Sequence, residues 1–206
     1  MSYSGIYGIT DDALLPEEIL VERVECALKA GLGMLQYRSK NPDKTIKQKV
    51  AHQLSDLCKR YDVPLLINDD PLLAKQVNAE GVHLGQADSD LTEARNLLGP
   101  EAIIGITCHA QLDLAINAEA NGANYVAFGR FFPSRTKPDA SPASLDLITE
   151  AKQKLTVPVV AIGGINPENG AAAVAAGADM LAVIHALFAG DDVTANTNKL
   201  VKLYAS

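Results

Sequence analysis

Two acidic residues follow neighbouring apolar runs of the sequence, in positions suited to a metal ion. Asp69 directly follows the run at 65–68, and Asp88 comes shortly after the run at 81–84. If the two runs are adjacent parallel strands, both carboxylates lie at the same end of a sheet. Mg²⁺ takes one or two carboxylates and fills its other positions with water and substrate phosphate oxygens. We therefore predict a Mg²⁺ site at Asp69 and Asp88, with helix capping as the alternative role for Asp88, and we expect Asp70 to cap a helix.

Three hydrogen-bond donors alternate along the segment QYRSK at 36–40. The two-residue period of a strand places Gln36, Arg38 and Lys40 on one side of this segment. An amide, a guanidinium and an ammonium group suit a multiply charged phosphate, because the arginine fork can bind two oxygens together. The pattern predicts an anion site, and solvated charges at a strand end are the alternative.

A second anion site is expected later in the chain. Gly163 and Gly164 follow one apolar run, and Ile184 and His185 end another before a short helical segment. Backbone N–H groups at such positions commonly hold a phosphate in α/β barrels. The segment GRFFPSRTKP at 129–138 mixes hydroxyls, cations and aromatic rings, which indicates a substrate-binding loop rather than a plain surface loop.

The sequence contains no convincing pattern for a catalytic nucleophile near these sites. Cys108 and His109 are adjacent, so their side chains project in different directions, and nothing nearby indicates a lowered thiol pKa. Thr107 either bonds to a ligand or starts the next helix, and His83 is expected inside a strand as a core or lining residue. Two anion sites and one metal site are sufficient for a group transfer in which a diphosphate leaves.

The elements that position these residues alternate between short apolar runs and longer segments of helical period, which is typical of a parallel sheet. This alternation predicts a single (β/α)₈ TIM barrel. An open doubly wound sheet is the alternative, but it commonly has a glycine-rich loop after the first strand, and residues 8–12 lack one. The expected strands are 5–9, 34–37, 65–68, 81–84, 103–107, 125–128, 159–162 and 180–184.

The segment between the second and third runs illustrates the helical period. Ile46, Val50, Leu54 and Leu57 fall at intervals of four, four and three residues and form one apolar stripe, whereas His52 falls on the opposite face. This spacing predicts an amphipathic helix that packs its stripe against the sheet.

The composition restricts the class of protein. The chain of 206 residues carries a net charge of −7, which disfavours binding to nucleic acid, and it contains no run that could span a membrane. Its three cysteines lack the spacing of a zinc site and cannot all pair in disulfides, which favours a reducing compartment. We expect one cytoplasmic domain over 1–206 that binds small molecules, and homo-oligomer formation stays open.

The motifs, taken in order, resemble those of the thiamine-phosphate synthase family. They are QYRSK at 36–40, IND at 67–69, GVHLGQAD at 81–88, IIGITCH at 103–109, FPSRTK at 132–137 and AIGGI at 161–165, so the resemblance covers nearly the whole chain. AIGGI alone is common in phosphate-binding barrels, but the ordered set is specific. The resemblance implies Mg²⁺-dependent transfer of a hydroxymethylpyrimidine group from its diphosphate to a thiazole phosphate. Pyrophosphate leaves first, and the thiazole nitrogen captures the resulting cation.

The resemblance also implies a role for each matching residue. Arg38, Lys40 and Lys137 would stabilise the leaving group. Thr107 and Ser134 exchange the family's usual serine and threonine hydroxyls, and His185 stands where serine is usual. The residues implied for the pyrimidine diphosphate are Gln36, Arg38, Lys40, Asn68, Thr107 and Lys137, those for Mg²⁺ are Asp69 and Asp88, and those for the thiazole phosphate are Ser134, Arg135, Thr136, Gly163, Ile184 and His185.

Two other functions are compatible with such a barrel. A thiazole tautomerase of the same barrel family expels no diphosphate and does not need the carboxylates at Asp69 and Asp88. A non-catalytic phosphate-binding barrel would act as a sensor or partner protein. The metal carboxylates together with the donors of QYRSK favour the synthase over both.

Overall fold

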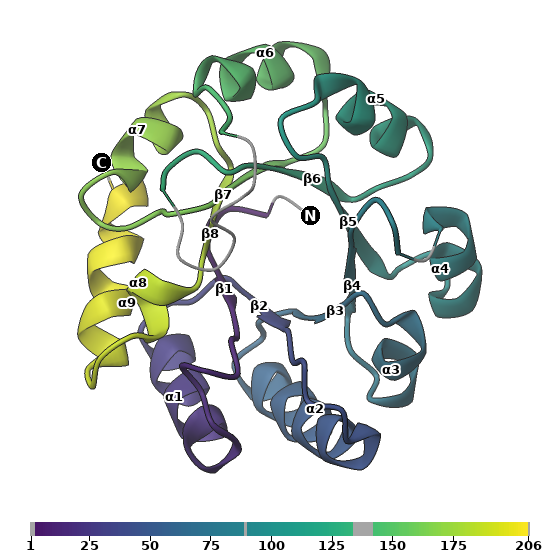
Figure 1. Ribbon diagram of the computed structural model, residues 1–206, viewed down its shortest axis with the longest axis vertical. Coiled ribbons are helices and arrows are strands. Elements are labelled where there is room, and N and C mark those ends of the chain that lie inside the picture. The colour runs from purple at the N-terminus through teal and green to yellow at the C-terminus, as the bar shows by residue number, and fades with distance from the viewer. Residues whose placement is uncertain (1–2, 89, 134–141, 206) are drawn as a thin grey trace.

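The computed structural model describes residues 3–88, 90–133 and 142–205. Within these ranges, eight parallel strands form a closed barrel in the order β1 to β8. Helices surround the strands as a ring (Figure 1). The strands are β1 Gly5–Ile9, β2 Met34–Tyr37, β3 Leu65–Asn68, β4 Gly81–Leu84, β5 Ile103–Thr107, β6 Tyr125–Phe128, β7 Val159–Ile162 and β8 Met180–Val183.

The helices follow the strands in alternation. Two helices and a 3₁₀ turn come after the last strand, so the C-terminal segment packs outside β8 and β1. The helices are α1 Glu17–Lys29, α2 Lys44–Arg60, α3 Pro71–Gln76, α4 Leu91–Leu98, α5 Leu112–Ala120, α6 Asp146–Lys154, α7 Gly170–Ala175, α8 His185–Phe188 and α9 Val193–Val201, followed by η1 Lys202–Tyr204.

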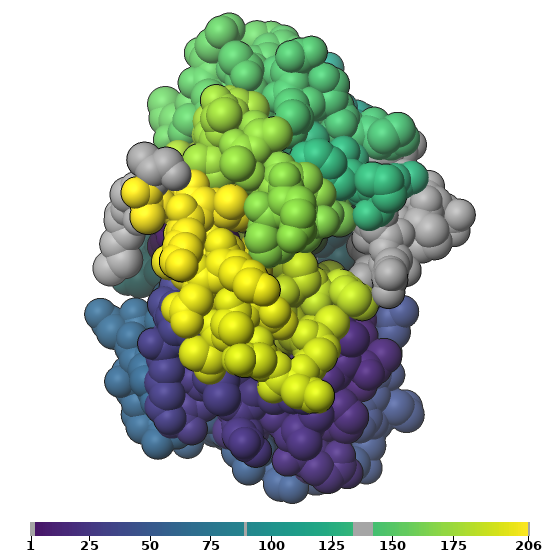
Figure 2. All heavy atoms as spheres, turned by 90° about the vertical axis from the view of Figure 1, so that its left-hand side faces the viewer, coloured from purple at the N-terminus to yellow at the C-terminus, as the bar shows by residue number. Residues whose placement is uncertain are grey.

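The pairing of the first and last strands closes the barrel. Tyr7 of β1 lies opposite Ala182 of β8 on one side and opposite Met34 of β2 on the other. Because all strands are parallel, their carboxyl ends meet at one rim. The C-terminal helix α9, in yellow, packs against α1, in purple (Figure 2), and it also contacts α8 and β1.

The predicted barrel is confirmed, and seven of the eight predicted strands have the expected bounds. The exception is the last strand, which was expected to reach Ile184 but ends at Val183. Ile184 has helical φ and ψ angles of −113° and −79°, and its carbonyl accepts the N–H groups of Leu187 and Phe188. The start of α8 therefore takes this residue out of the strand.

Apolar side chains form two separate layers, one inside the barrel and one between the barrel and its helices. Tyr7, Met34, Leu66 and Tyr125 belong to the inner cluster. The larger outer cluster includes the predicted stripe of α2, in which Val50, Leu54 and Leu57 are buried and Ile46 is partly buried, whereas His52 is exposed. The helical period thus correctly predicted which face of α2 meets the sheet.

Polar side chains and glycines mark the helix ends. Asp70 caps α3, as expected, because its carboxylate accepts the Leu73 N–H at 2.9 Å. The cap of α4 is Asp90, whose side chain accepts the N–H of Thr92 at 2.7 Å, and Asp88 therefore does not have that role. Gly31 ends the turn after α1 with a φ of +98°, a conformation that side chains with a Cβ rarely adopt.

No helix among the described residues is both long enough and apolar enough to cross a bilayer.

The buried stripe of α2 generates a stability prediction. Leu54 is fully buried, so Leu54→Ala should lower the free energy of unfolding by about 2–5 kcal/mol through lost burial and a residual cavity. The matched control His52→Ala lies on the exposed face of the same helix and should change it by less than about 0.5 kcal/mol. Urea unfolding followed by circular dichroism measures both. Equal losses in the two variants would contradict the assignment of the buried face.

Candidate active site

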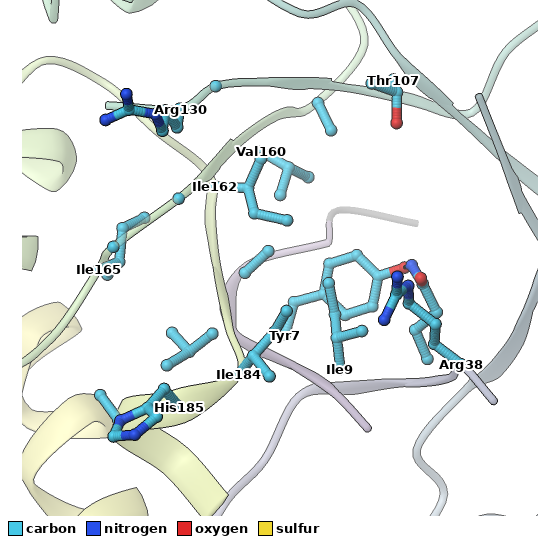
Figure 3. Close-up of a pocket in the computed structure, with 18 of the residues that line it drawn as sticks. Tyr7, Ile9, Arg38, Thr107, Arg130, Val160, Ile162, Ile165, Ile184 and His185 are labelled. Carbon is cyan, nitrogen blue, oxygen red and sulfur yellow. Dashed lines mark hydrogen bonds between the residues drawn. The ribbon is translucent and has the colours of Figure 1, made fainter. Parts of the chain in front are cut away.

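A pocket of about 350 Å³ opens at the carboxyl ends of the strands. Its walls differ in chemistry (Figure 3). Ile9, Val160, Ile162 and Ile184 supply apolar surface from β1, β7 and the end of β8. Polar lining side chains come from both sides of the pocket. Those at or after β2 to β5 are Gln36, Arg38, Asn68, His83, Thr107 and His109, and those that follow β6, β7 and β8 are Arg130, Asn166 and His185. A ligand here meets apolar surface from β1, β7 and β8 together with hydrogen-bonding groups on both sides of the pocket.

The segment after β2 contributes only part of its predicted trio to this pocket. Gln36 and Arg38 line it, whereas Lys40 is exposed and borders a separate hollow of about 390 Å³ with Asp12 and Glu17. The reason is that β2 ends at Tyr37, so the two-residue alternation does not extend as far as Lys40. The structure therefore does not bring the three predicted donors together around one space.

The loop after β1 holds this segment in place. The Thr10 hydroxyl accepts the Arg38 N–H at 2.8 Å, and Asp12 accepts the Lys40 N–H at 2.6 Å. The guanidinium of Arg38 lies 3.7 Å from the Asp11 carboxylate. These contacts fix the backbone around Arg38 and keep its guanidinium beside the pocket.

The two predicted metal carboxylates lie at the same rim of the barrel, in the loops that follow β3 and β4. Both side chains are exposed, and neither lines the pocket itself. Asp69 has a left-handed φ of +59°, and its carboxylate accepts the Asn68 side-chain amide at 2.5 Å. Asp88 accepts the N–H of Gly85 at 2.7 Å, which folds its loop back toward the end of β4.

The carboxylates of Asp69 and Asp88 suit an ion such as Mg²⁺, which takes few protein ligands, better than an ion that the protein must enclose completely. Among the described residues, no group of three or more His, Cys, Asp or Glu side chains is placed to hold a metal. Two exposed carboxylates after adjacent strands leave several positions for water and phosphate oxygens, and Mg²⁺ commonly binds in this way. Asp69 and Asp88 are thus suited to this ion only when a ligand supplies further oxygens.

A chain of hydrogen bonds crosses the barrel interior along the pocket, which Tyr7, Gln36, His83 and Thr107 all line. The Gln36 amide donates to the Tyr7 hydroxyl at 2.6 Å, and the hydroxyls of Tyr7 and Tyr125 lie 2.8 Å apart. The Tyr125 hydroxyl lies 2.7 Å from Nδ1 of His83, and Nε2 of His83 lies 2.8 Å from the Thr107 hydroxyl. We call these five residues the core hydrogen-bond chain. It links β2, β1, β6, β4 and β5 in that order.

Burial determines the protonation of the two tyrosines in this chain. Tyr7 and Tyr125 are 1% and 0% exposed, and the loss of solvation raises the pKa of each phenol well above its usual range. Both therefore stay protonated at neutral pH. Gly105 makes room for the Tyr125 ring, since a Cβ at this position of β5 would lie 1.9 Å from Cζ of the ring.

The opposite side of the pocket is built by the ends of β7 and β8. Gly163, Ile184 and His185, which were predicted for a second anion site, all line it. Gly163 has a φ of +103°, and a Cβ there would lie 2.3 Å from Cβ of Arg130. This close approach packs the loop after β7 against the loop after β6.

The loop after β6 is described as far as Pro133. The Phe131 N–H donates to the Ile162 carbonyl at 3.2 Å, and the Phe132 N–H donates to the Gly163 carbonyl at 3.0 Å, so this loop begins beside the end of β7. Four predicted ligand-binding residues, Ser134, Arg135, Thr136 and Lys137, lie outside the described residues.

The cysteine after β5 has the environment of a core residue. Cys108 is fully buried, and desolvation raises the pKa of its thiol to about 12. His109 is exposed, lines the pocket and has a left-handed φ of +50°. The buried thiol would be a poor nucleophile at neutral pH, which agrees with the expectation that this pair does not form a nucleophile and its base.

Sequence reasoning missed several residues of the site. Tyr7 and Tyr125 lie in the middle of apolar strands, where a tyrosine looks like a packing residue, and their partners come from other strands. Arg130 was noted only as part of its loop, yet it lines the pocket. One signal was available for Tyr125, because Gly105 precedes Thr107 by two residues on the same face of β5 and leaves space for a large neighbour.

Comparisons with known proteins agree on one family. A family model described as thiamine monophosphate synthase matches residues 6–187. A thiamine-phosphate synthase of Saccharophagus degradans is 56% identical over 189 residues, which are 91% of this chain and 87% of that protein. Another, from Thioalkalivibrio sulfidiphilus, is 50% identical over 97% of this chain and 95% of its own length. A solved thiamine phosphate pyrophosphorylase from Pyrococcus furiosus superposes with a TM-score of 0.89 at 34% identity, covering 98% of this chain and 96% of that chain.

Proposed function

The chain belongs to the thiamine monophosphate synthase family and is a transferase, and from this premise we propose its substrates and the roles of its residues. The hydroxymethylpyrimidine group moves from its diphosphate to the ring nitrogen of a thiazole phosphate. The products are thiamine phosphate and pyrophosphate. The observation that carries this proposal is the pocket at one rim of the barrel, in which apolar side chains lie among Arg38, Arg130 and His185.

The pocket walls suit two small heteroaromatic rings. Ile9, Val160 and Ile162 present apolar surface to the ring faces, while Gln36 and Thr107 present hydrogen-bonding groups to ring edges. We place the pyrimidine against Gln36, Asn68 and Thr107. The side of Gly163, Ile184 and His185 then receives the thiazole phosphate, where backbone N–H groups near the start of α8 meet the anion. Ser134, Arg135 and Thr136 are proposed for the same phosphate.

Charge on the leaving diphosphate is the main catalytic problem, because the bond from the pyrimidine methylene to oxygen breaks before the thiazole nitrogen attacks. Arg38 lies beside the pocket with its guanidinium near Asp11, so an incoming diphosphate competes with that carboxylate for the same charge. We propose that Arg38, Lys40 and Lys137 stabilise the departing pyrophosphate. In the structure, Lys40 borders the separate hollow and does not line the pocket. Cys108 takes no part, since its thiol is buried and protonated.

Mg²⁺ is the proposed cofactor. Asp69 and Asp88 would hold it, and the substrate diphosphate would supply oxygens that the protein does not. When bound, the ion would neutralise part of the negative charge that collects on the leaving group. The exposed positions of both carboxylates leave room for this shared coordination.

The function is tested by a coupling assay. Purified protein with Mg²⁺, hydroxymethylpyrimidine diphosphate and thiazole phosphate should release pyrophosphate and form thiamine phosphate, measured by a pyrophosphate assay and chromatography. EDTA should stop turnover, and added Mg²⁺ should restore it. Failure to turn over with both substrates present would reject the synthase. Isomerisation of a carboxylated thiazole phosphate that EDTA does not affect would support a thiazole tautomerase instead.

The metal carboxylates are tested by removing one charge at a time. Asp69→Asn and Asp88→Asn should each lower kcat by at least ~10²-fold if the metal contributes a few kcal/mol of charge stabilisation. Asp70→Asn is the matched control, because asparagine also caps helices well and α3 should keep its N-terminus. Its kcat should stay within about threefold of the original enzyme, well under 1.4 kcal/mol in activation free energy. Unchanged rates in both Asp69→Asn and Asp88→Asn would remove this metal site.

A further inference from the structure

Four residues of the core hydrogen-bond chain carry more polar side-chain hydrogens than there are hydrogen bonds among them. This difference determines which group donates and which accepts at each contact. Tyr7, Tyr125, a neutral His83 and Thr107 each carry one polar side-chain hydrogen, and the chain joins them by only three contacts. One of the four hydrogens is therefore left for a partner outside the chain. Which residue keeps this hydrogen depends on the direction in which hydrogen bonds are donated along the chain.

The Gln36 end sets this direction. Because the Gln36 amide donates to the Tyr7 oxygen, the hydrogen of Tyr7 is directed to its other partner, the Tyr125 oxygen. Tyr125 is then an acceptor for Tyr7, and its own hydrogen points to Nδ1 of His83. Both phenols are buried and protonated, so neither can serve only as an acceptor without leaving a polar hydrogen unpaired in the core.

The direction continues through the imidazole. With Nδ1 accepting from Tyr125, a neutral ring carries its hydrogen on Nε2 and donates it to the Thr107 oxygen. An imidazolium would place an N–H against the hydrogen of Tyr125 and break the sequence of donors. The described residues contain no buried side-chain nitrogen or oxygen without a hydrogen-bond partner, which agrees with a chain in which every interior group is paired.

We infer that the core hydrogen-bond chain holds His83 as the Nε2–H tautomer and thereby presents the Thr107 hydroxyl as a hydrogen-bond donor to the ligand. Thr107 lines the pocket, so its remaining hydrogen can reach a bound molecule. Tyr7, Tyr125 and His83 are positioning residues that act through it. The ligand atom that meets this hydrogen is consequently an acceptor, such as a ring nitrogen without hydrogen. The identity of that ligand as an aminopyrimidine rests on the proposed function.

The tautomer can be measured without substrate. Protein labelled with ¹⁵N-histidine contains four histidines, and the His83→Gln variant identifies the His83 signals by their loss. At neutral pH, the ¹⁵N shifts of His83 should show a protonated Nε2 and an unprotonated Nδ1. A hydrogen on Nδ1, or on both nitrogens, would overturn the inference. This measurement decides the matter even if the variants below do not fold.

Removing one link should release the tautomer. Tyr125→Phe deletes the donor to Nδ1, and the His83 signals should move toward a mixture of the two tautomers. Tyr204→Phe is the matched control, since the Tyr204 hydroxyl bonds to the Ala178 carbonyl outside the chain and its loss should leave the His83 signals unchanged. A His83 spectrum that is the same in Tyr125→Phe and the original protein would contradict a positioning role.

The consequence for binding is tested by kinetics in the coupling assay. Thr107→Val should raise KM for the pyrimidine diphosphate about tenfold, the weight of one hydrogen bond, and leave KM for the thiazole phosphate unchanged. Thr107→Ser keeps the donor and should restore KM. Tyr125→Phe should raise the same KM, whereas Tyr204→Phe should not. An unchanged pyrimidine KM in Thr107→Val would overturn the donor role. Absence of turnover in the original protein would reject the proposed function and leave the tautomer measurement valid.

Discussion

Closure of the parallel barrel is the constraint on which the site depends. All strands are parallel and therefore end at the same rim, and the pairing of β1 with β8 closes that rim into a ring. Residues as distant in sequence as Arg38 and His185 consequently line one pocket. In an open sheet, β1 and β8 would be edge strands without this pairing, and the residues at their ends would lie apart. The acidic loops after β3 and β4 belong to the same rim because their strands run in the same direction.

The sequence was sufficient for the barrel because each strand is a short apolar run with a clear end, and only the limit at Ile184 was wrong, by one residue. Rim residues could be predicted since they directly follow those runs. Lys40 was misplaced relative to the pocket because alternation holds only inside a strand, and β2 ends at Tyr37. The core hydrogen-bond chain could not be predicted, since its contacts join five strands and depend on the stagger of the barrel.

The interior of the barrel connects the fold to the chemistry of the pocket. Buried tyrosines in such a place cost free energy unless each hydroxyl is paired, and the chain from Gln36 to Thr107 provides that pairing. Gly105 permits it by leaving space for the Tyr125 ring. The same groups that satisfy the core therefore also determine which hydrogen-bonding face the pocket offers. Family membership explains the transferase activity, while this arrangement supports the proposed role of Thr107 in binding the pyrimidine ring.

The central claim is that one rim collects a metal ion and cations around a departing polyanion. Its most direct test is a crystal structure with pyrophosphate and Mn²⁺, which replaces Mg²⁺ and is located by anomalous scattering. The account predicts a manganese peak bound by Asp69 and Asp88 and bridged to pyrophosphate, with the Arg38 guanidinium on the same anion. A manganese ion bound elsewhere, or carboxylates too far apart to share one ion, would contradict it.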